Sequence, residues 1–384
     1  DIYNQVVQVG HPKVDWREKI DSIIMHKFGG YLFLIAVLIS FFYFIFKLGA
    51  FMEGFLLDGF ESLQVLLSNE FNQNPFLFHF VQSIVWGISG GIAIVLPYLV
   101  PFLIGLTILE DIGYLPRVAF LMDTFMHRIG LHGTSIVPAV LGYGCNVPAV
   151  MATRILPSRR DKIIAAVISS MIPCSARSVV IFGLVAYYLG PFWALGIYVF
   201  NIIVIALAGK ILSLLMPDVS PGMIMEIPPY RFPSLQVIIK KTWLRIKEFI
   251  FVAWPILIVG SVVLGLLEFF HMDVLINTFL SPLTAFLGLP AVVGTTLIFG
   301  VLRKELALIM LTQALGTTHV IGILSTTQIL TFTVFITFYI PCVATMAVLG
   351  KELNRLWMMI VIIITLLMAI VFSYLVHLFG HQLF

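Results

Sequence analysis

Long apolar runs alternate with short polar stretches along most of this sequence. A helix needs about 20 predominantly apolar residues to cross the hydrocarbon core of a bilayer. Seven runs are close to that length or longer, and the pattern predicts a membrane-spanning helix in each: 30–51, 77–109, 163–190, 192–216, 250–267, 328–350 and 356–380. The sequence therefore predicts an all-α polytopic membrane protein.

The composition excludes a soluble domain. Hydrophobic residues make up 60% of the 384 positions and charged residues only 11%, whereas about 25% of the residues in a soluble domain are charged. Three cysteines are too few for a disulfide framework. The polar opening stretch does not resemble a cleavable signal peptide. Because the chain opens with Asp1 rather than Met, we expect that an upstream part has been removed.

Basic residues gather in four of the polar stretches and predict the orientation, because cytoplasmic loops carry an excess of Lys and Arg. The four clusters are Arg17/Lys19/Lys27, Arg154/Arg159/Arg160/Lys162, Lys240/Lys241/Arg245/Lys247 and Lys351/Arg355. Segments 49–76 and 268–287 hold acidic residues without Lys or Arg, so we expect them outside. With the N-terminus inside, all clusters fall inside only if 131–153 and 288–316 are re-entrant hairpins. Two ordinary spans would place a basic cluster on the wrong side.

Residues of the first half of the chain recur in the second half. At a fixed offset of 158, Pro97, Glu110, Gly130, Leu131, Gly142 and Ala149 meet Pro255, Glu268, Gly288, Leu289, Gly300 and Ala307. With ten more residues inserted, the segment 172–176 meets 340–344. The first copy starts outside and the second inside, so we expect two inverted repeats. Transporters with inverted repeats and interrupted helices hold their substrate near the midplane of the membrane.

The repeats give a division of the chain. It consists of a cytosolic or interfacial leading segment (1–29), a first span with an external segment (30–76), repeat 1 (77–216), a cytoplasmic linker (217–249) and repeat 2 (250–384). Each repeat is expected to act as a gate. The linker is marked by a concentration of prolines between 217 and 235.

Proline interrupts two predicted spans, and a cysteine follows each interruption. Pro173 and Pro341 each remove a backbone donor and clash with the preceding turn, which frees carbonyl oxygens. Lipid cannot satisfy those oxygens, so the breaks must face protein or a polar cavity. Cys174 and Cys342 come next in the chain. The breaks are therefore the expected place for chemistry.

The third cysteine, Cys145, lies at the turn of the first hairpin, beside Tyr143, Gly144 and Asn146. A cysteine in a membrane segment usually packs as a small hydrophobe. Three cysteines at related breaks make a ligand role about as probable as packing. Thiolate suits Fe²⁺, Zn²⁺ or Cu⁺ and suits Mg²⁺ poorly.

The tip of the second hairpin is charged, with Arg303, Lys304 and Glu305 in succession. Charges in a membrane are costly and are usually paired or functional. Glu305 could bind a cation directly, whereas the two bases would repel one and are expected to form a gate or to pair with an acid. The candidate acids are Glu110, Asp111 and Glu268. An acidic interfacial cap is the alternative for Glu110 and Asp111.

Several of these segments closely resemble the ferrous iron transporter B (FeoB) family. They are 109–120, 142–149, 173–177 and 339–342, and the resemblance covers nearly the whole chain. It implies Fe²⁺ uptake across a cell membrane and a fold similar to concentrative nucleoside carriers. It also implies that Cys145, Cys174 and Cys342 line the iron path. Tyr143, Gly144, Asn146 and Ser175 are expected beside them, with Glu110, Glu268, Arg303 and Lys304 in the gate.

The chain departs from this family in one respect. The family normally carries an N-terminal GTP-binding domain, yet the sequence has no G-x-x-x-x-G-K-[ST] phosphate loop. We therefore expect GTP and Mg²⁺ to act only through a domain that is missing or lies on a separate chain. The other expected partners are the lipid bilayer, small accessory subunits and further copies in a homo-oligomer, with no nucleic acid. The expected location is the cell (inner or plasma) membrane, with a cytoplasmic N-terminus.

Two other classes of function remain open from the residues. A secondary carrier of an organic solute, or of another soft divalent cation, would share the inverted-repeat plan. An intramembrane metal-dependent enzyme would need a metal-bound water or nucleophile with a positioned acid or base. The sequence has no H-E-x-x-H helix, so we expect a transporter rather than an enzyme.

Overall fold

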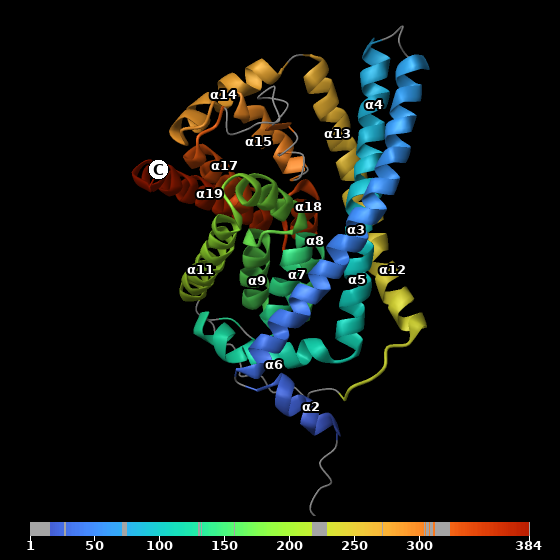
Figure 1. The fold of residues 1–384 in the computed structure, drawn as a ribbon, viewed down its shortest axis with the longest axis vertical. Coiled ribbons are helices and arrows are strands. Elements are labelled where there is room, and N and C mark those ends of the chain that lie inside the picture. Colours follow the sequence, from blue (N-terminus) through green and yellow to red (C-terminus); the bar gives the residue numbers. More distant parts are fainter. Residues whose placement is uncertain are drawn as a thin grey trace, which may run out of the picture.

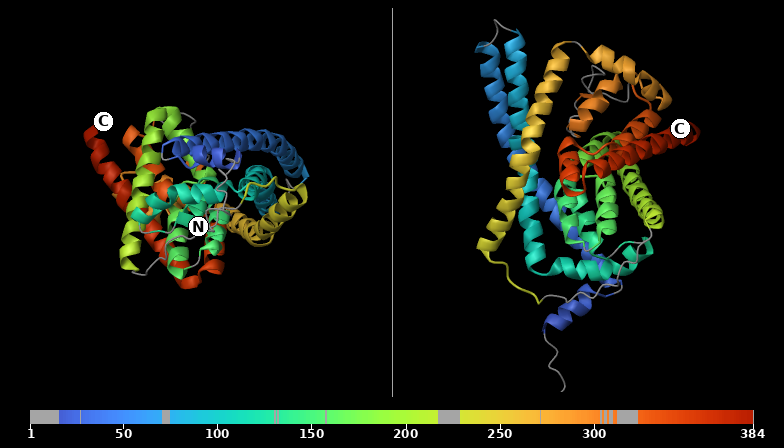
Figure 2. Two further views of the ribbon diagram at one scale, coloured as in Figure 1. Left: turned by 90° about the horizontal axis from the view of Figure 1, so that it is seen from below. Right: turned by 180° about the vertical axis from the view of Figure 1, so that it is seen from behind.

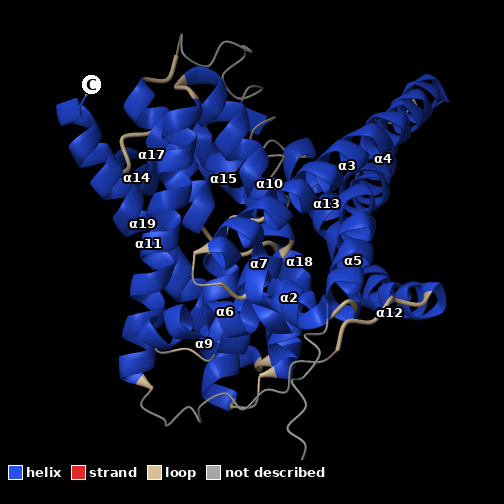
Figure 3. Ribbon diagram, turned by 60° about the horizontal axis from the view of Figure 1, so that its bottom comes forward, coloured by secondary structure: helices blue, strands red, loops and turns tan. Residues whose placement is uncertain are grey.

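A computed structural model describes residues 16–26, 28–70, 75–129, 131, 133–156, 158–216, 229–270, 272–302, 304, 307, 310–311 and 323–383. Within these ranges the chain is helical and has no strand (Figure 3). Seven helical segments are long and apolar enough to cross a membrane: Gly29–Phe60, His79–Asp111, Arg159–Ala186, Pro191–Leu215, Leu235–Leu267, Thr326–Glu352 and Arg355–Gly380. The prediction of an all-α polytopic membrane protein is confirmed.

The first long helix extends further than the sequence predicted. After the short helix α2 (Trp16–Ile24), α3 runs from Gly29 to Glu70 without interruption. Its 42 residues extend over roughly 63 Å, about twice the hydrocarbon thickness. The sequence has no proline between 29 and 74, so no helix-breaking residue interrupts α3 where an external segment was expected. In Figure 1, α3 and α4 (Pro75–Ser89) run side by side, and Figure 3 shows their ends extending away from the other helices.

The first helix of each repeat is a composite of three pieces. In repeat 1 these are α4, the π-helical turn η1 (Gly90–Val95) and α5 (Leu96–Asp111); in repeat 2 they are α12 (Leu235–Glu248), η5 (Phe249–Ala253) and α13 (Trp254–Phe269). Each π-helical turn ends two residues before a proline, Pro97 or Pro255. A proline crowds the preceding turn of a helix and removes one of its hydrogen bonds, which explains why the helix widens there.

These two composite helices lie antiparallel along their whole length. Helix α4 packs against α13, and α5 packs against α12 (Figures 1 and 2). Gly87 allows the close approach, because a Cβ atom at this position would lie 2.8 Å from the Cα atom of Ile258. Equivalent helices that run in opposite directions are the relationship expected of inverted repeats.

Helix α12 was not predicted. Residues 217–249 were expected to form a cytoplasmic linker, but a helix begins at Leu235 and continues into α13. Ser234 caps its N-terminus, since its Oγ atom accepts a hydrogen bond from the backbone N–H of Val237. The basic residues that suggested a loop lie on this helix instead.

The predicted breaks are present in both repeats. The interrupted helices are α9 (Arg159–Met171) with α10 (Ser175–Val180), and α17 (Thr326–Phe338) with α18 (Val343–Glu352). Pro173 and Pro341 lie in the non-helical residues between the two halves. The first hairpin is also present, because α7 (Ile136–Gly144) packs against α8 (Asn146–Ala152) with Cys145 extended between them. Of the second hairpin, the structure describes α15 (Val293–Leu302) and a few later residues.

The interrupted helices form the centre of the molecule. In the apolar 18-residue stretch of each span, buried residues make up 78% for Arg159–Ala186 and 72% for Thr326–Glu352, against 41% or less for the other five spans. The central span Arg159–Ala186 ends in the π-helical turn η4 (Ile181–Ala186). The surrounding elements are α6 (Tyr114–Ile129), η2 (Gly133–Ser135), η3 (Thr153–Ile155), α11 (Pro191–Leu215), α14 (Asp273–Phe286) and α19 (Arg355–Leu383). Helix α19 packs on α17, and α11 packs on α9 (Figure 1).

Candidate functional site

The three cysteines occupy equivalent local positions. Each is the N-cap residue of a helix that restarts after an interruption: Cys145 before α8, Cys174 before α10 and Cys342 before α18. All three are partly buried and none forms a disulfide. The expectation that the cysteines lie at breaks in the backbone is confirmed. Helix α8 packs against α18, so two of the three restarting helices belong to different repeats and touch each other.

Arg177 satisfies carbonyl oxygens at both breaks. Its Nη1 atom donates to the carbonyl oxygens of Ser170 (2.8 Å) and Ile172 (3.1 Å) at the first break. Its Nη2 atom donates to the carbonyl oxygen of Tyr339 at the second break (2.7 Å). The side chain is 1% exposed. One guanidinium therefore joins the two breaks across the centre of the molecule.

Two amide side chains complete the first break. Asn201 of α11 donates its Nδ2 atom to the carbonyl oxygen of Met171 (3.1 Å). Asn146 lies at the hairpin turn, and in its hydrogen-bonded orientation its amide nitrogen donates to the carbonyl oxygens of Ser169 (3.1 Å) and Gly142 (3.0 Å). Residues 169–172 are where α9 ends, so all four of their carbonyl oxygens are satisfied by side chains.

Lys304 has the corresponding role at the second break. Its Nζ atom donates to the carbonyl oxygen of Ile340 at 2.6 Å and lies 4.3 Å from the centre of the Tyr339 ring. The hydroxyl of Tyr339 donates to the carbonyl oxygen of Leu297 in α15 (2.9 Å). Lys304 follows Asn146 by 158 residues, which is the offset of the two repeats. Each hairpin thus sends one side chain to the break of its own repeat.

The cysteines lie beside these groups. Cys174 is within electrostatic range of Arg177, Lys304 and Cys342. The Sγ atom of Cys342 lies 3.1 Å from the Oγ1 atom of Thr345. In the part of the chain that the structure describes, no three His, Cys, Asp or Glu side chains are placed to hold one metal ion together.

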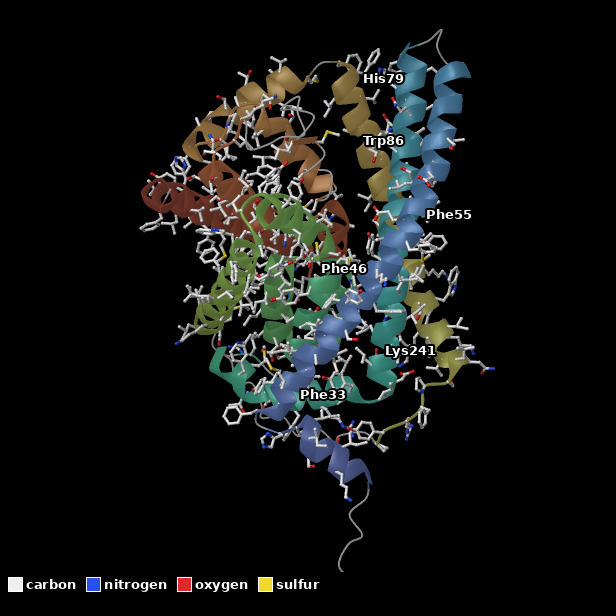
Figure 4. All side chains as sticks on the ribbon, viewed as in Figure 1. Phe33, Phe46, Phe55, His79, Trp86 and Lys241 are labelled. Carbon is white, nitrogen blue, oxygen red and sulfur yellow. The ribbon has the colours of Figure 1, made fainter. Side chains whose placement is uncertain are left out.

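The two acidic residues that end α5, Glu110 and Asp111, pair with different residues than expected. Lys241 donates to Asp111 (2.6 Å) and contacts Glu110 (3.4 Å), and Arg245 donates to Glu110 (2.8 Å). Figure 4 shows Lys241 on α12 near the end of α5. The expected pairing of Lys304 with these acids is therefore corrected, because α12 supplies their bases and the amine of Lys304 is directed to a backbone carbonyl.

The structure locates the remaining candidates as follows. Tyr143 and Gly144 end α7, and Ser175 begins α10 directly after Cys174. Glu268 lies near the end of α13, and its side chain is outside the described part. Arg303 and Glu305 are also outside the described residues. Asn201 and the bridging role of Arg177 were missed, although Arg177 belongs to a segment that resembled the family.

A second polar cluster lies at the other end of the molecule from the projecting helices. Arg117 of α6 is 2% exposed and donates to Asp21 of α2 through Nε (2.7 Å) and to the carbonyl oxygen of Gly113 (2.7 Å). Tyr230, between the repeats, donates its hydroxyl to Asp21 (2.5 Å), and its ring lies 3.7 Å from the Arg117 guanidinium carbon. Three separate segments of the chain therefore meet here.

The contacts within this cluster shift the pKa values of Asp21 and Tyr230 in opposite directions. Burial raises the pKa of Asp21, but the hydrogen bonds from Arg117 and Tyr230 and the charge of Arg117 outweigh it, so the pKa lies below its usual value. Burial and the hydrogen bond to Asp21 raise the pKa of Tyr230 to about 12. At neutral pH the carboxylate is therefore ionised and the phenol is protonated.

Two family models match this chain. A family model described as "Nucleoside recognition" (Gate) matches residues 92–188 and 250–356, and these two segments begin 158 residues apart. A second model, "Ferrous iron transport protein B C terminus", matches residues 194–245. No solved structure matches the chain significantly.

Curated relatives are similar over most of the chain. The "Fe(2+) transporter FeoB" of Methanocaldococcus jannaschii is 26% identical over 420 residues, which cover 100% of this chain and 62% of the relative. That of Staphylococcus aureus is 30% identical over 399 residues, covering 94% and 59%. An "Fe(2+) transport protein A/Fe(2+) transporter FeoB fusion protein" of Porphyromonas gingivalis is 29% identical over 66% of this chain and 30% of the fusion. The chain spans about six tenths of the first two relatives.

Proposed function

Because the chain belongs to the FeoB family and matches its membrane part, we propose that it carries Fe²⁺ across the cell membrane. The observation that carries this proposal is the position of the three cysteines. Cys145, Cys174 and Cys342 each stand where a helix restarts after an interruption. Three thiols at related positions in a lipid-embedded bundle supply soft ligands where the backbone also supplies oxygens.

The proposed path follows these breaks from one repeat to the other. Fe²⁺ is a borderline cation that accepts both thiolate and oxygen ligands. The described thiols do not form one closed site, so the ion passes from one ligand to the next, with Glu305 as a further ligand. Tyr143, Gly144, Asn146 and Ser175 line this path.

The charged residues form the gate around this path. Lys304 and Arg303 are the basic residues of the gate at the second hairpin. Glu110, at the end of α5 in repeat 1, forms an ion pair with Arg245 of α12. Glu268 is the equivalent residue of repeat 2. The opening of either repeat would change the surroundings of these charges.

The role of the thiols is tested by replacing each of the three with serine. Uptake of ⁵⁵Fe²⁺ into vesicles should fall in each variant, because a hydroxyl of the same shape is a much poorer ligand for a soft cation. Val199→Ser on the exposed face of α11 is the matched control, since it adds a hydroxyl to a span away from the breaks. Parental uptake in all three cysteine variants would refute the ligand role.

A nucleoside-like organic solute is the second candidate cargo, because the matching family model is described as "Nucleoside recognition". Such a solute needs a pocket with aromatic and amide groups. Uptake of radiolabelled uridine and ⁵⁵Fe²⁺ by the same vesicles separates the two. Competition by Zn²⁺ but not by Mg²⁺ would show how far the selectivity extends to other soft divalent cations.

Regulation is proposed to come from outside this chain. A GTP-binding domain, in cis or in trans, would act on the cytoplasmic side through α2. A small accessory subunit is also proposed, because the Porphyromonas gingivalis relative is named as a fusion with Fe(2+) transport protein A. The chain itself acts as a transporter, in a homo-oligomer, with its N-terminus in the cytoplasm. Labelling of Lys19→Cys with an impermeant thiol reagent from either side of a vesicle tests the orientation.

A further inference from the structure

Two basic side chains are almost completely buried at the centre of the bundle. Arg177 is 1% exposed and Lys304 is 2% exposed. Both lie between membrane-spanning segments, where a charge is costly unless polar groups surround it. In a path proposed for a cation, their positive charge also repels the cargo. Their presence therefore needs an explanation beyond packing.

Arg177 is surrounded by oxygens in the manner of a bound metal cation. Its guanidinium contacts the carbonyl oxygens of Ser170, Ile172 and Tyr339, at 2.7 to 3.1 Å. These oxygens come from both breaks, and unwound carbonyls of this kind coordinate alkali-metal cations in transporters. Hard cations such as Na⁺ and K⁺ prefer the same backbone oxygens. The guanidinium thus stands where such a cation could be held.

A comparison of Lys304 with Asn146 shows that a hydrogen bond to the carbonyl oxygen of a break does not require a charged donor. Its ammonium contacts the carbonyl oxygen of Ile340 and the face of the Tyr339 ring, and an aromatic face attracts cations. At the equivalent position of repeat 1, the neutral amide of Asn146 satisfies the carbonyls of its break. An amide from the hairpin can therefore donate to a break without a charge, and the charge of Lys304 is an additional property of the hairpin in repeat 2.

We propose that Arg177 and Lys304 are tethered cations, which occupy the carbonyl-lined breaks of the two repeats in place of a free alkali-metal ion. The side chains fill the breaks when no cargo is present and exclude small inorganic cations from them. Cargo can use these carbonyls only when the side chains withdraw. The inference rests on the proposed function only in placing the cargo path at the breaks.

The test removes one tethered charge and asks whether an inorganic cation replaces it. The purified parent chain, Lys304→Ala and Arg177→Ala are placed in lipid nanodiscs, and thermal-unfolding midpoints are compared in choline chloride, NaCl and KCl at equal ionic strength. Both variants should unfold at lower temperature than the parent in choline chloride. Their midpoints should rise in NaCl or KCl and reach a plateau with concentration, because a ligand that binds only the folded state stabilises it. The parent should show no such rise.

Two matched variants separate this inference from a merely structural role. Lys304→Gln keeps a donor for Ile340 without the charge or the vacated space, so it should lose the specific response to Na⁺ or K⁺. Lys210→Ala, on an exposed face of α11, controls for the loss of one positive charge. A response of Lys304→Ala no larger than that of Lys210→Ala would overturn the inference, even if Arg177→Ala fails to fold.

The outcome is independent of iron transport. A saturable Na⁺ or K⁺ response in Lys304→Ala together with no ⁵⁵Fe²⁺ uptake by the parent would retain the tethered cations and refute the proposed cargo. Iron uptake by the parent without any cation response in the variants would retain the cargo and refute the tethered cations.

Discussion

Asp21 and Arg117 join the leading helix to the helix that follows repeat 1's first span. The Nε atom of Arg117 lies 2.7 Å from Asp21 Oδ1, and Nη2 lies 3.3 Å from Oδ2. Tyr230 closes the cluster from the segment between the repeats. The ion pair therefore couples α2 to repeat 1, and the hydrogen bond from Tyr230 couples it to the segment between the repeats. This cluster is the contact through which the proposed GTP-binding domain, in cis or in trans, would act on α2.

Asp21→Asn should loosen α2 without unfolding the bundle. The change keeps the shape but removes the negative charge that pairs with the buried Arg117. Removing one partner of a buried ion pair costs about 3–5 kcal/mol, and the cost is smaller here because Asp21 is 21% exposed. Hydrogen exchange in α2 and α6 should become faster, while exchange in α9 and α17 should stay at the parental rate. Ser22→Ala, on the same short helix, is the control.

The pH dependence of this contact follows from the two shifted pKa values. The pKa of Asp21 is lowered in the folded state, so its contribution is complete above the unfolded value of about 3.9 and is lost as the pH falls through the folded value. The pKa of Tyr230 is raised to about 12, so its contribution is complete below about 10 and is lost as the pH rises toward 12. Exchange protection of α2 should therefore be constant between about pH 5 and 9. A midpoint inside that window would contradict the assignment.

Gly144→Ala should disrupt the first hairpin. A Cβ atom at Gly144 would lie 2.2 Å from the Phe102 ring, and Phe102 is itself buried, so the ring has no room to move. Overpacking of this kind costs about 1–3 kcal/mol. The unfolding temperature should fall, and iron uptake should fall with it because Cys145 is the next residue. Gly196→Ala is the control, because no atom lies within 4 Å of its added Cβ and an alanine favours the helix.

Local patterns predicted the spans, the breaks and the inverted repeat. Each of these depends on residues close together in the chain: apolar runs set the spans, and Pro173 and Pro341 set the breaks. The helix α12 was missed for a related reason. Its basic residues are typical of a cytoplasmic loop, and only the folded chain shows that Lys241 and Arg245 face the acids that end α5.

The partners of the freed carbonyls could not be predicted from the sequence. The hydrogen bond from Arg177 to Tyr339 joins residues 162 positions apart, and no local period or motif encodes such a contact. The sequence pattern predicted that Lys304 pairs with an acid or forms a gate, because charges in membranes are usually paired or functional. Backbone oxygens released by proline are an equally good partner, and their availability depends on how the two repeats meet.

The antiparallel packing of α4 and α13 gives the most direct test of the inverted arrangement. A Cβ atom at Gly87 would lie 3.4 Å from the Cβ atom of Ile258 and 2.8 Å from its Cα atom, so a small separation of the two helices brings the Cβ atoms into the range of about 3.5–4.5 Å that a disulfide requires. The double variant Gly87→Cys/Ile258→Cys should therefore form an intramolecular disulfide, seen as a reductant-sensitive band shift after proteolysis between the repeats.

The native cysteines make the single variants necessary as controls. Gly87→Cys and Ile258→Cys alone should give no shift, since Cys145, Cys174 and Cys342 form no disulfide in the parent. If the repeats slide against each other during transport, the cross-linked double variant should also lose iron uptake and regain it with reductant. Failure of the disulfide to form in a folded double variant under mild oxidation would contradict the close antiparallel contact of α4 and α13.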